Sequence, residues 1–398
     1  MEVRCAVDDK AGIAPRVLFV NHSSKLGGAE LILLSILEEF DEASSVWLFE
    51  EGPLRTRLEQ KAVRTVLATR RSGFSEVTRN GSLLRALPFA VDILKMAGDI
   101  GAYARSHEVI YANSQKAFVC GAAAATLARR PLIWHLHDIV TPAHYGKGQL
   151  RLQRALARLA SRVIVPSKAA ADAFSQLCGG KRKPIIVSNG VTLAPDEMAK
   201  ASRDERRRHL GLPTGFVVGV FSRLSPWKAQ HILLQALKDV SDANCIVVGE
   251  ALFGETRYAE SLRSLAQDLG VAERVHFLGF RSDVASLMRA VDVVVHPSVD
   301  PEPFGRTLVE AMLCRTPLIA TDTGAAAEIL ADGRAGLLVA PRNPSALVSA
   351  INEIRANPAA ASSRASFGEQ RALALFTEEQ MRNGILRVVR DVIPPYSC

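Results

Sequence analysis

The stretch VHPSVDPEPFGRTLVEAM, residues 295–312, decides the fold and locates the site. It begins at the end of an apolar run, 291–295, whose length and lack of alternation are typical of a strand buried on both faces. A loop with three prolines follows, and a helix is predicted from Gly305 onward. A buried strand followed by a loop and a helix is the repeating element of parallel α/β sheets.

This alternation runs along the chain in two series. Strands are predicted at 16–20, 45–49, 109–111, 132–134, 163–165 and 185–187, and again at 216–221, 245–248, 275–278, 291–295, 318–320 and 336–339. A polar stretch at 192–202 separates the series. We predict an α/β fold in which two Rossmann-like parallel-sheet domains, 1–195 and 196–375, face a central cleft, and a C-terminal helix at 376–398 packs back on the first domain. Ligands of such sheets bind beyond the carboxyl ends of the strands, so this cleft is the expected site.

The composition is that of a packed α/β protein. Hydrophobic residues make up 48% of the 398 and charged residues 23%, and no window approaches the roughly 18 consecutive apolar residues of a membrane span. The chain opens on no signal-peptide pattern and its six cysteines form no Cys-x-x-Cys motif, so we expect a cytoplasmic protein with reduced thiols.

Residues 1–190 hold 26 Lys and Arg against 17 Asp and Glu, so the net charge of +8 lies in the first half. An anionic partner of that half is therefore expected.

Two carboxylates bracket the predicted helix start. Glu302 lies in the loop, where it can accept hydrogen bonds from a sugar hydroxyl, and Glu310 lies in the helix, where it can hold a ribose diol. The free N–H groups of the first helical turn offer an anion site between them. This spacing suits a ligand with a sugar, a diphosphate and a ribose in a row. A capped helix with a solvated face would show the same spacing.

A second motif, FSRLSPWK at 221–228, joins a predicted strand to a predicted helix. Arg223 and Lys228 are suited to neutralise a diphosphate leaving group, which gains charge during glycosyl transfer. Taken alone, such a motif is more often two surface cations in a loop.

Together these two segments resemble family 4 of the retaining glycosyltransferases, which have the GT-B fold. The resemblance covers nearly the whole chain. It implies that Arg223 and Lys228 grip the nucleotide diphosphate, that Glu302 lies beside the donor sugar and that Glu310 binds ribose. It also implies that the segment between the glutamates presents backbone amides to the sugar and phosphate, through Phe304, Gly305, Arg306, Thr307 and Leu308.

Three further segments carry the resemblance. FLGFR at 277–281 resembles the loop that contacts the base, which implies base contacts for Phe280 and Arg281. SKLGGAE at 24–30 resembles the glycine loop after the first strand, where Gly27 and Gly28 would bring backbone amides to the donor phosphate and the acceptor. His137, in HLHD at 135–138, resembles the histidine near the donor sugar. A plain turn explains the glycines and a core histidine explains His137 equally simply.

The resemblance completes the predicted mechanism. The catalytic set is His137, Arg223, Lys228 and Glu302. No Asp-x-Asp pair occurs in the sequence, so neither a metal nor another cofactor is expected. The resemblance implies attack on the same face as the leaving phosphate, which helps to deprotonate the acceptor, and a covalent intermediate on an enzyme carboxylate is the alternative. Ala229 and the pair Gly324-Ala325 depart from glycines that are frequent in the family, which affects the fine geometry of the donor site.

The predicted reaction moves a sugar, with retention, from a nucleotide-sugar to a hydroxyl of a glycan, lipid-linked or small-molecule acceptor during polysaccharide or glycoconjugate biosynthesis. A UDP-sugar is favoured over a GDP-sugar. A nucleotide-sugar epimerase, a glycan phosphorylase and an inactive binding protein share the two-domain layout, whereas a dinucleotide dehydrogenase would need a Gly-x-Gly-x-x-Gly after the first strand. Nucleic acid is not an expected partner because the arginines lack interleaved aromatic residues.

Two amphipathic stretches bear on the acceptor. On a helix at 149–162 four arginines would lie on one face beside a leucine stripe, and these are Arg151, Arg154, Arg158 and Arg162. A second stretch, 83–105, is rich in large apolar residues. Such faces suit peripheral docking at the inner face of an anionic membrane, which would bring a lipid-linked acceptor within reach. The same pattern is also that of a helix whose leucines pack in the core and whose arginines face the solvent.

Overall fold

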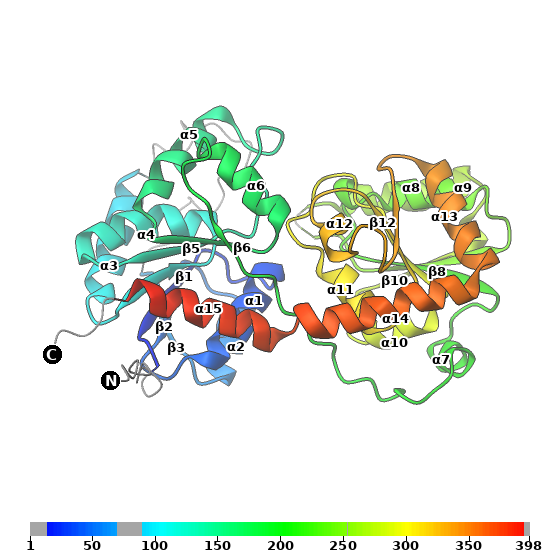
Figure 1. The fold of residues 1–398 in the computed structure, drawn as a ribbon, viewed down its shortest axis with the longest axis horizontal. Coiled ribbons are helices and arrows are strands. Elements are labelled where there is room, and N and C mark those ends of the chain that lie inside the picture. Colours follow the sequence, from blue (N-terminus) through cyan, green and yellow to red (C-terminus); the bar gives the residue numbers. More distant parts are fainter. Residues whose placement is uncertain (1–13, 70–89, 253, 394–398) are drawn as a thin grey trace, which may run out of the picture. The chain divides into compact units, whose positions relative to one another are not determined.

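The structure is a computed structural model that describes residues 14–69, 90–252 and 254–393. These residues divide into two compact units. Unit 1 is drawn from Met1–Pro166, Ala171–Val187 and Met381–Cys398, and unit 2 from Ser167–Ala170 and Ser188–Gln380. Each unit is built on one parallel sheet with helices packed on it (Figure 1). The predicted α/β class with two Rossmann-like parallel-sheet domains is therefore confirmed.

The sheet of unit 1 has the order β3-β2-β1-β4-β5-β6-β7 among the described residues, and all its pairs are parallel. Its strands are β1 (Val17–Asn21), β2 (Ser45–Leu48), β3 (Arg64–Leu67), β4 (Val109–Ala112), β5 (Leu132–His135), β6 (Arg162–Val165) and β7 (Ile185–Ile186). Its helices are α1 (Gly28–Ile36), α2 (Pro53–Gln60), α3 (Ala90–Ala104), α4 (Gln115–Ala128), α5 (Lys147–Leu156), α6 (Lys168–Leu177) and most of α15 (Glu378–Val392). The strand order reverses between β1 and β4, which makes their carboxyl ends a topological switch point.

The C-terminal helix α15 completes the core of unit 1. Its apolar face, formed by Met381, Ile385, Val388 and Val389, is buried in the same cluster as Val17 and Phe19 of β1 and residues of β2. Every residue of β1 is buried, as its unbroken apolar run predicts for a strand covered on both faces.

Unit 2 holds a six-stranded parallel sheet in the order β10-β9-β8-β11-β12-β13. Its strands are β8 (Phe216–Phe221), β9 (Ala243–Val248), β10 (Val275–Gly279), β11 (Val293–His296), β12 (Leu318–Thr321) and β13 (Leu337–Val339). Its helices are α7 (Arg203–Leu210), α8 (Gln230–Leu237), α9 (Thr256–Asp268), α10 (Val284–Ala290), α11 (Arg306–Leu313), α12 (Ala326–Ile329), α13 (Pro344–Ala356) and α14 (Pro358–Leu375). Here the order reverses between β8 and β11, so the second switch point lies at the ends of these two strands.

Both faces of this second sheet are covered. Along β8, Val217 and Phe221 belong to the core cluster shared with α10 and α11, whereas Val218 and Val220 belong to the cluster shared with α8 and α13. Successive side chains of a strand point to opposite faces, which accounts for the split. The continuous apolar runs in the sequence therefore reflect burial on two sides.

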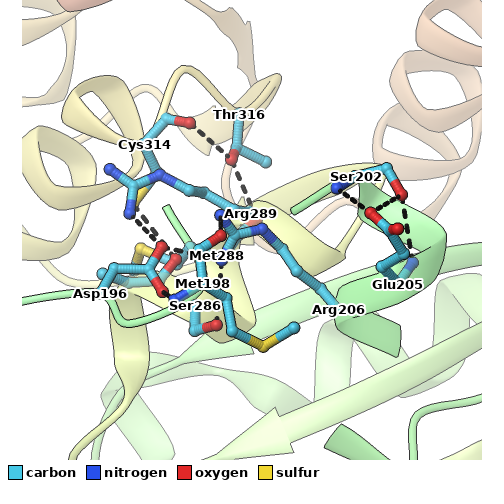
Figure 2. A network of polar contacts seen from close by, with 11 residues as sticks. Asp196, Met198, Ser202, Glu205, Arg206, Ser286, Met288, Arg289, Cys314 and Thr316 are labelled. Atoms are coloured by element: carbon cyan, nitrogen blue, oxygen red, sulfur yellow. Dashed lines mark hydrogen bonds and ion pairs between the residues drawn. The ribbon is translucent and has the colours of Figure 1, made fainter. Parts of the chain in front are cut away.

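The polar stretch at 192–202 is anchored to unit 2 by a buried charge cluster (Figure 2). Arg206 and Arg289 each donate to Oδ2 of Asp196 at 2.7 Å, and Arg206 also donates to Oγ of Ser286 at 3.1 Å. Burial alone would raise the pKa of Asp196, but the hydrogen bonds from the two arginines lower it below its usual value. The charges in this stretch thus fix the chain entering α7 rather than forming a loose linker.

The helix predicted at 149–162 is shorter than expected. α5 ends at Leu156, a 3₁₀ turn (Ala157–Leu159) carries Arg158, and Arg162 begins β6 and pairs with Asp391 at 2.7 Å. The guanidinium of Arg182 donates to the carbonyls of Ala157 and Ala160, which caps the end of this helical segment. The β-branched run 163–165 that follows favours a strand and joins the sheet. Four arginines on one helical face was therefore a wrong prediction.

Only part of the apolar stretch predicted at 83–105 lies within the described residues, and this part forms α3. The edge strand β3 was not predicted, because RTVL is too short and too polar to stand out.

The cysteines in the described residues are free and buried, as expected, and they are Cys120, Cys178, Cys245 and Cys314. None of the described helices has the length and apolar character needed to cross a membrane.

Candidate functional site

Two loops meet at the switch point of unit 2. The loop 222–229 leaves β8 and the loop 297–305 leaves β11. The amide of Val299 donates to the carbonyl of Trp227 at 2.9 Å, and the Thr307 hydroxyl donates to the carbonyl of Phe221 at 3.3 Å. These bonds hold the two predicted motifs side by side at the carboxyl edge of the sheet, where parallel sheets bind their ligands.

The carboxylate of Glu302 is the most strongly held charge of this site. Glu302 is only 8% exposed, and its Oε1 accepts from Lys228 Nζ at 2.5 Å and from the Ser298 hydroxyl, and lies 2.7 Å from His296 Nε2. Burial by itself would raise its pKa, but the charges of His296 and Lys228 and their hydrogen bonds outweigh burial and hold the pKa well below its usual value. Glu302 is thus a firmly ionised carboxylate with a fixed orientation.

His296 is a site residue that the sequence prediction missed. It is the last residue of β11 and is almost fully buried. A polar residue that closes an apolar strand at the ligand edge was the available signal, and the prediction used only the motif after it. The Lys228–Glu302 pair was also missed, because the two residues were assigned to separate parts of a ligand.

A glycine behind Glu302 sets the path of its backbone. Gly324 has φ +58°, and a Cβ atom there would lie 2.3 Å from both the N and the O of Glu302. The next residue, Ala325, donates its amide to the Glu302 carbonyl at 3.0 Å. Only glycine fits where these two backbones meet.

We expect Gly324→Ala to lower the free energy of unfolding by at least about 2 kcal/mol, because the left-handed backbone and the clash both oppose a Cβ. Gly270→Ala is a matched control, since Gly270 has φ +68° with nothing within 4 Å, and only the backbone cost of about 1 kcal/mol applies. Denaturant unfolding of both variants checks the difference. Equal losses would contradict the close approach.

The two predicted cations share one aromatic ring. Lys228 Nζ lies 4.4 Å and Arg223 Cζ 5.4 Å from the centroid of the Trp227 ring. Arg223 also pairs with Glu255 at 3.4 Å, and Ser225 donates to the other oxygen of Glu255 at 2.6 Å. Each cation therefore has a carboxylate partner, and Glu255 is a second residue that sequence reasoning missed.

Ala229, which follows these cations, adopts φ +55°. This left-handed conformation favours glycine, which is the residue frequent in the resembling family at this position. The chain keeps the turn geometry despite the substitution.

The start of α11 is arranged as predicted. Gly305 precedes the helix with φ +86°, and Arg306 donates to the Gly190 carbonyl at 3.0 Å. Phe304 and Leu308 are buried in the core cluster, so their side chains fix the start of the helix. Glu310 lies 3.9 Å from Arg306, and burial raises its pKa, opposed by the charges of Arg306 and Lys228.

The predicted base-contacting residues follow β10. Phe280 is 71% exposed, so its ring is accessible. Arg281 is held flat by a two-pronged pair with Asp283, at 2.8 and 2.5 Å. An exposed ring beside an oriented guanidinium can stack on a planar ligand.

Three predicted residues belong to unit 1, where they follow the carboxyl ends of β1 and β5. Gly27 caps α1 and donates its amide to Glu30 at 3.2 Å, and Gly28 begins the helix. His137 follows β5, and its Nε2 lies 2.9 Å from the Asn113 side-chain oxygen. Burial lowers the pKa of His137 to about 4, so this imidazole is neutral at neutral pH. His135 is a core residue whose Nδ1 lies 2.7 Å from the Tyr111 hydroxyl.

Comparison with protein-family models covers most of the chain. The model described as Glycosyltransferase Family 4 matches residues 26–194, and the model described as Glycosyl transferases group 1 matches residues 202–372. A D-inositol 3-phosphate glycosyltransferase of Mycolicibacterium smegmatis is 34% identical over 211 residues, which are 52% of this chain and 48% of the relative. The match thus spans about half the length of that relative.

Solved structures match over nearly the full length. Anabaena HepE in complex with UDP is 38% identical, with a TM-score of 0.82 over 94% of this chain and 100% of HepE. The complex of HepE with UDP-glucose is 37% identical, with a TM-score of 0.81 over 95% of this chain and 100% of HepE. A sucrose-phosphate synthase from Thermosynechococcus elongatus, at 21% identity and a TM-score of 0.75, shares the fold over 95% of this chain and 98% of its own. The chain belongs to glycosyltransferase family 4 and has the GT-B fold.

Proposed function

We propose that this protein transfers a sugar, with retention of its anomeric configuration, from a UDP-sugar to an acceptor hydroxyl. One observation carries the proposal: the ionised Glu302, paired with Lys228, lies in the loop that leads into α11 at the switch point of unit 2. The chain's relative HepE has been solved with UDP and with UDP-glucose, which favours UDP over GDP as the nucleotide.

The donor would lie along the start of α11. Its diphosphate would bind the amides of residues 305–307, where the helix dipole favours an anion, whereas the Leu308 amide already donates to the Gly305 carbonyl at 3.0 Å. Glu310 would accept from the ribose hydroxyls, and Phe280 and Arg281 would contact the base. Glu302 would accept from hydroxyls of the donor sugar through the carboxylate oxygen that Lys228 does not occupy.

Lys228 and Arg223 would stabilise the leaving diphosphate. Each cation is paired with a carboxylate in the absence of donor, so neither is a lone buried charge. An ammonium has three donors and can bind a phosphate oxygen while still holding Glu302. We propose that these cations and the helix dipole carry out the charge neutralisation that a metal performs elsewhere, so activity should persist in EDTA.

The low pKa of Glu302 bears on the mechanism. A carboxylate whose charge is neutralised by Lys228 and His296 is a weak nucleophile and a weak base. A double displacement through Glu302 is therefore disfavoured. We propose that the acceptor attacks on the face that the diphosphate leaves and that a phosphate oxygen takes its proton.

The decisive assay is titration of the protein with UDP-glucose, GDP-mannose and ADP-glucose, followed by transfer assays with the best binder. We expect saturable binding of the UDP-sugar and an α-linked product from an α-linked donor, detected by NMR of the anomeric proton. An inverted product would contradict retention. Turnover of the sugar nucleotide without an acceptor would instead indicate an epimerase.

Acceptor recognition is assigned to unit 1, because the positive charge of the sequence lies in its first half. A glycan, a small molecule and a lipid-linked sugar are the candidate acceptors. Peripheral contact with an anionic membrane would favour the last of these. Co-sedimentation with vesicles that contain phosphatidylglycerol tests this, and recovery of the protein in the supernatant would exclude membrane docking.

We expect Glu310→Ala to weaken UDP-glucose binding about tenfold or more, because hydrogen bonds from a ligand to a charged group contribute about 1.5–3 kcal/mol. Isothermal titration measures the change. Glu273→Ala, which removes an exposed carboxylate after α9, should bind as the wild type does. Unchanged affinity in Glu310→Ala would remove the ribose assignment.

A further inference from the structure

A buried chain of polar side chains crosses the switch point of unit 1. β1 ends at Asn21 and β4 is followed by Asn113, and both asparagines are completely buried. Adjacent parallel strands bring the two amides together, with Asn113 Nδ2 3.1 Å from Asn21 Oδ1. The row of hydrogen-bonded side chains continues from Asn21 to Glu30 and from Asn113 to His137.

The contacts of Asn21 fix its amide orientation. Its Nδ2 donates to the Ser23 carbonyl at 2.6 Å and to Glu30 Oε1 at 3.3 Å. Both amide hydrogens are thereby used on acceptors, so its Oδ1 must be the atom that accepts from Asn113.

The same reasoning fixes Asn113. Its Nδ2 donates to Asn21 Oδ1 and to the Ala29 carbonyl at 3.2 Å. A flipped amide would set its oxygen against two acceptors. The oxygen of Asn113 therefore faces His137, and Nε2 of His137 must carry the proton that joins them.

We propose that Asn113, Asn21 and Glu30 are positioning residues that hold His137 as the Nε2–H tautomer and so present its Nδ1 lone pair to a substrate hydroxyl. All the hydrogen bonds run in one direction, from the imidazole to the carboxylate of Glu30. Hydrogen bonds aligned in this way strengthen one another in a buried site. This inference rests on the proposed glycosyl transfer only for the identity of the hydroxyl.

This row of hydrogen-bonded side chains also links His137 to the glycine loop. Glu30 accepts from the amide of Gly27 through Oε2 and from Asn21 through Oε1. Asn113 binds the carbonyl of Ala29 in the first turn of α1. The loop and the imidazole are thus set by one network, and a change in either asparagine should disturb both.

Burial lowers the pKa of His137 to about 4, which agrees with a neutral ring. A neutral ring with the proton on Nε2 can accept a hydrogen bond at Nδ1 but cannot donate one there. The imidazole is consequently suited to orient a hydroxyl rather than to protonate a leaving group.

The tautomer is measurable without any substrate. Long-range ¹H–¹⁵N NMR of the full chain with labelled histidine separates Nε2–H, Nδ1–H and exchanging imidazoles, and the loss of signals in His137→Gln assigns the residue. We expect a single Nε2–H form of His137 at pH 7. An Nδ1–H form, a charged ring or an exchange average would overturn the proposal, and this result does not depend on whether Asn113→Ala folds.

The variant Asn113→Ala tests the positioning role. We expect His137 to lose its single tautomer and kcat/KM to fall about tenfold, since one hydrogen bond of a network is lost. Tyr111→Phe is the matched control, because it removes a buried hydrogen bond to the neighbouring His135 and leaves the hydrogen bonds between His137, Asn113, Asn21 and Glu30 in place. It should keep the His137 spectrum and the activity. An unchanged spectrum in Asn113→Ala would overturn the inference, whereas absence of transfer in the wild type would overturn only the proposed function.

Discussion

Replacing Lys228 by alanine is expected to lower turnover about 10²–10³-fold, the loss typical of a group that stabilises transition-state charge. The Lys228 ammonium is the cation bonded to Glu302, at the loop that leads into α11. Its charge matters most when the diphosphate leaves, so kcat should fall more than donor affinity. Steady-state kinetics with a saturating acceptor separates the two effects.

Lys238→Ala is the control for this variant, because Lys238 is an exposed lysine just after α8. It should keep wild-type turnover. A melting curve of Lys228→Ala must show a folded protein at the assay temperature, since Glu302 loses one partner. Wild-type turnover in folded Lys228→Ala would remove the assignment of Lys228 to the leaving group.

The largest effect on stability is expected from Glu302→Ala. Removing one partner of a buried charge pair costs about 3–5 kcal/mol, because the charge of Lys228 is left uncompensated and His296 loses its hydrogen-bond partner. We expect the unfolding transition of unit 2 to move to lower denaturant concentration. The exposed Glu260→Ala should change stability by less than about 0.5 kcal/mol.

The effect of Glu302→Ala should depend on pH. The pKa of Glu302 is lower in the folded chain than its ordinary value of 4.5, so its ionisation stabilises the fold above that value. This contribution is lost as the pH falls from about 4.5 toward the folded pKa. Wild type and Glu302→Ala should therefore converge in acid. A difference that is constant from pH 7 to pH 3 would contradict the charge cluster.

Much of the fold was predictable because its signals are local. Apolar runs such as 216–221 and 293–295 formed buried strands, and the sequence motif around Gly305 correctly marked the start of α11. Edge strand β3 was missed, since its polar residues lack the pattern of a central strand. The helix at 149–162 was overextended because helical periodicity does not reveal that Arg182 caps its end from outside.

The candidate site was predictable where a motif specified it, as for Glu302, Glu310 and Lys228. Partners that meet only through the sheet order were missed, because spacing in sequence does not measure distance across a switch point. His296 beside Glu302, and Asn21 beside Asn113, are examples. In each case the signal was a polar residue at the carboxyl end of an apolar strand, which is where parallel sheets bind ligands.

We propose that the donor diphosphate binds at the start of α11 beside Lys228. A crystal structure of the chain with UDP tests it most directly. We predict diphosphate density within hydrogen-bond distance of the amides of residues 305–307 and of Lys228 Nζ. Diphosphate density elsewhere on the protein, with the start of α11 unoccupied, would contradict the account.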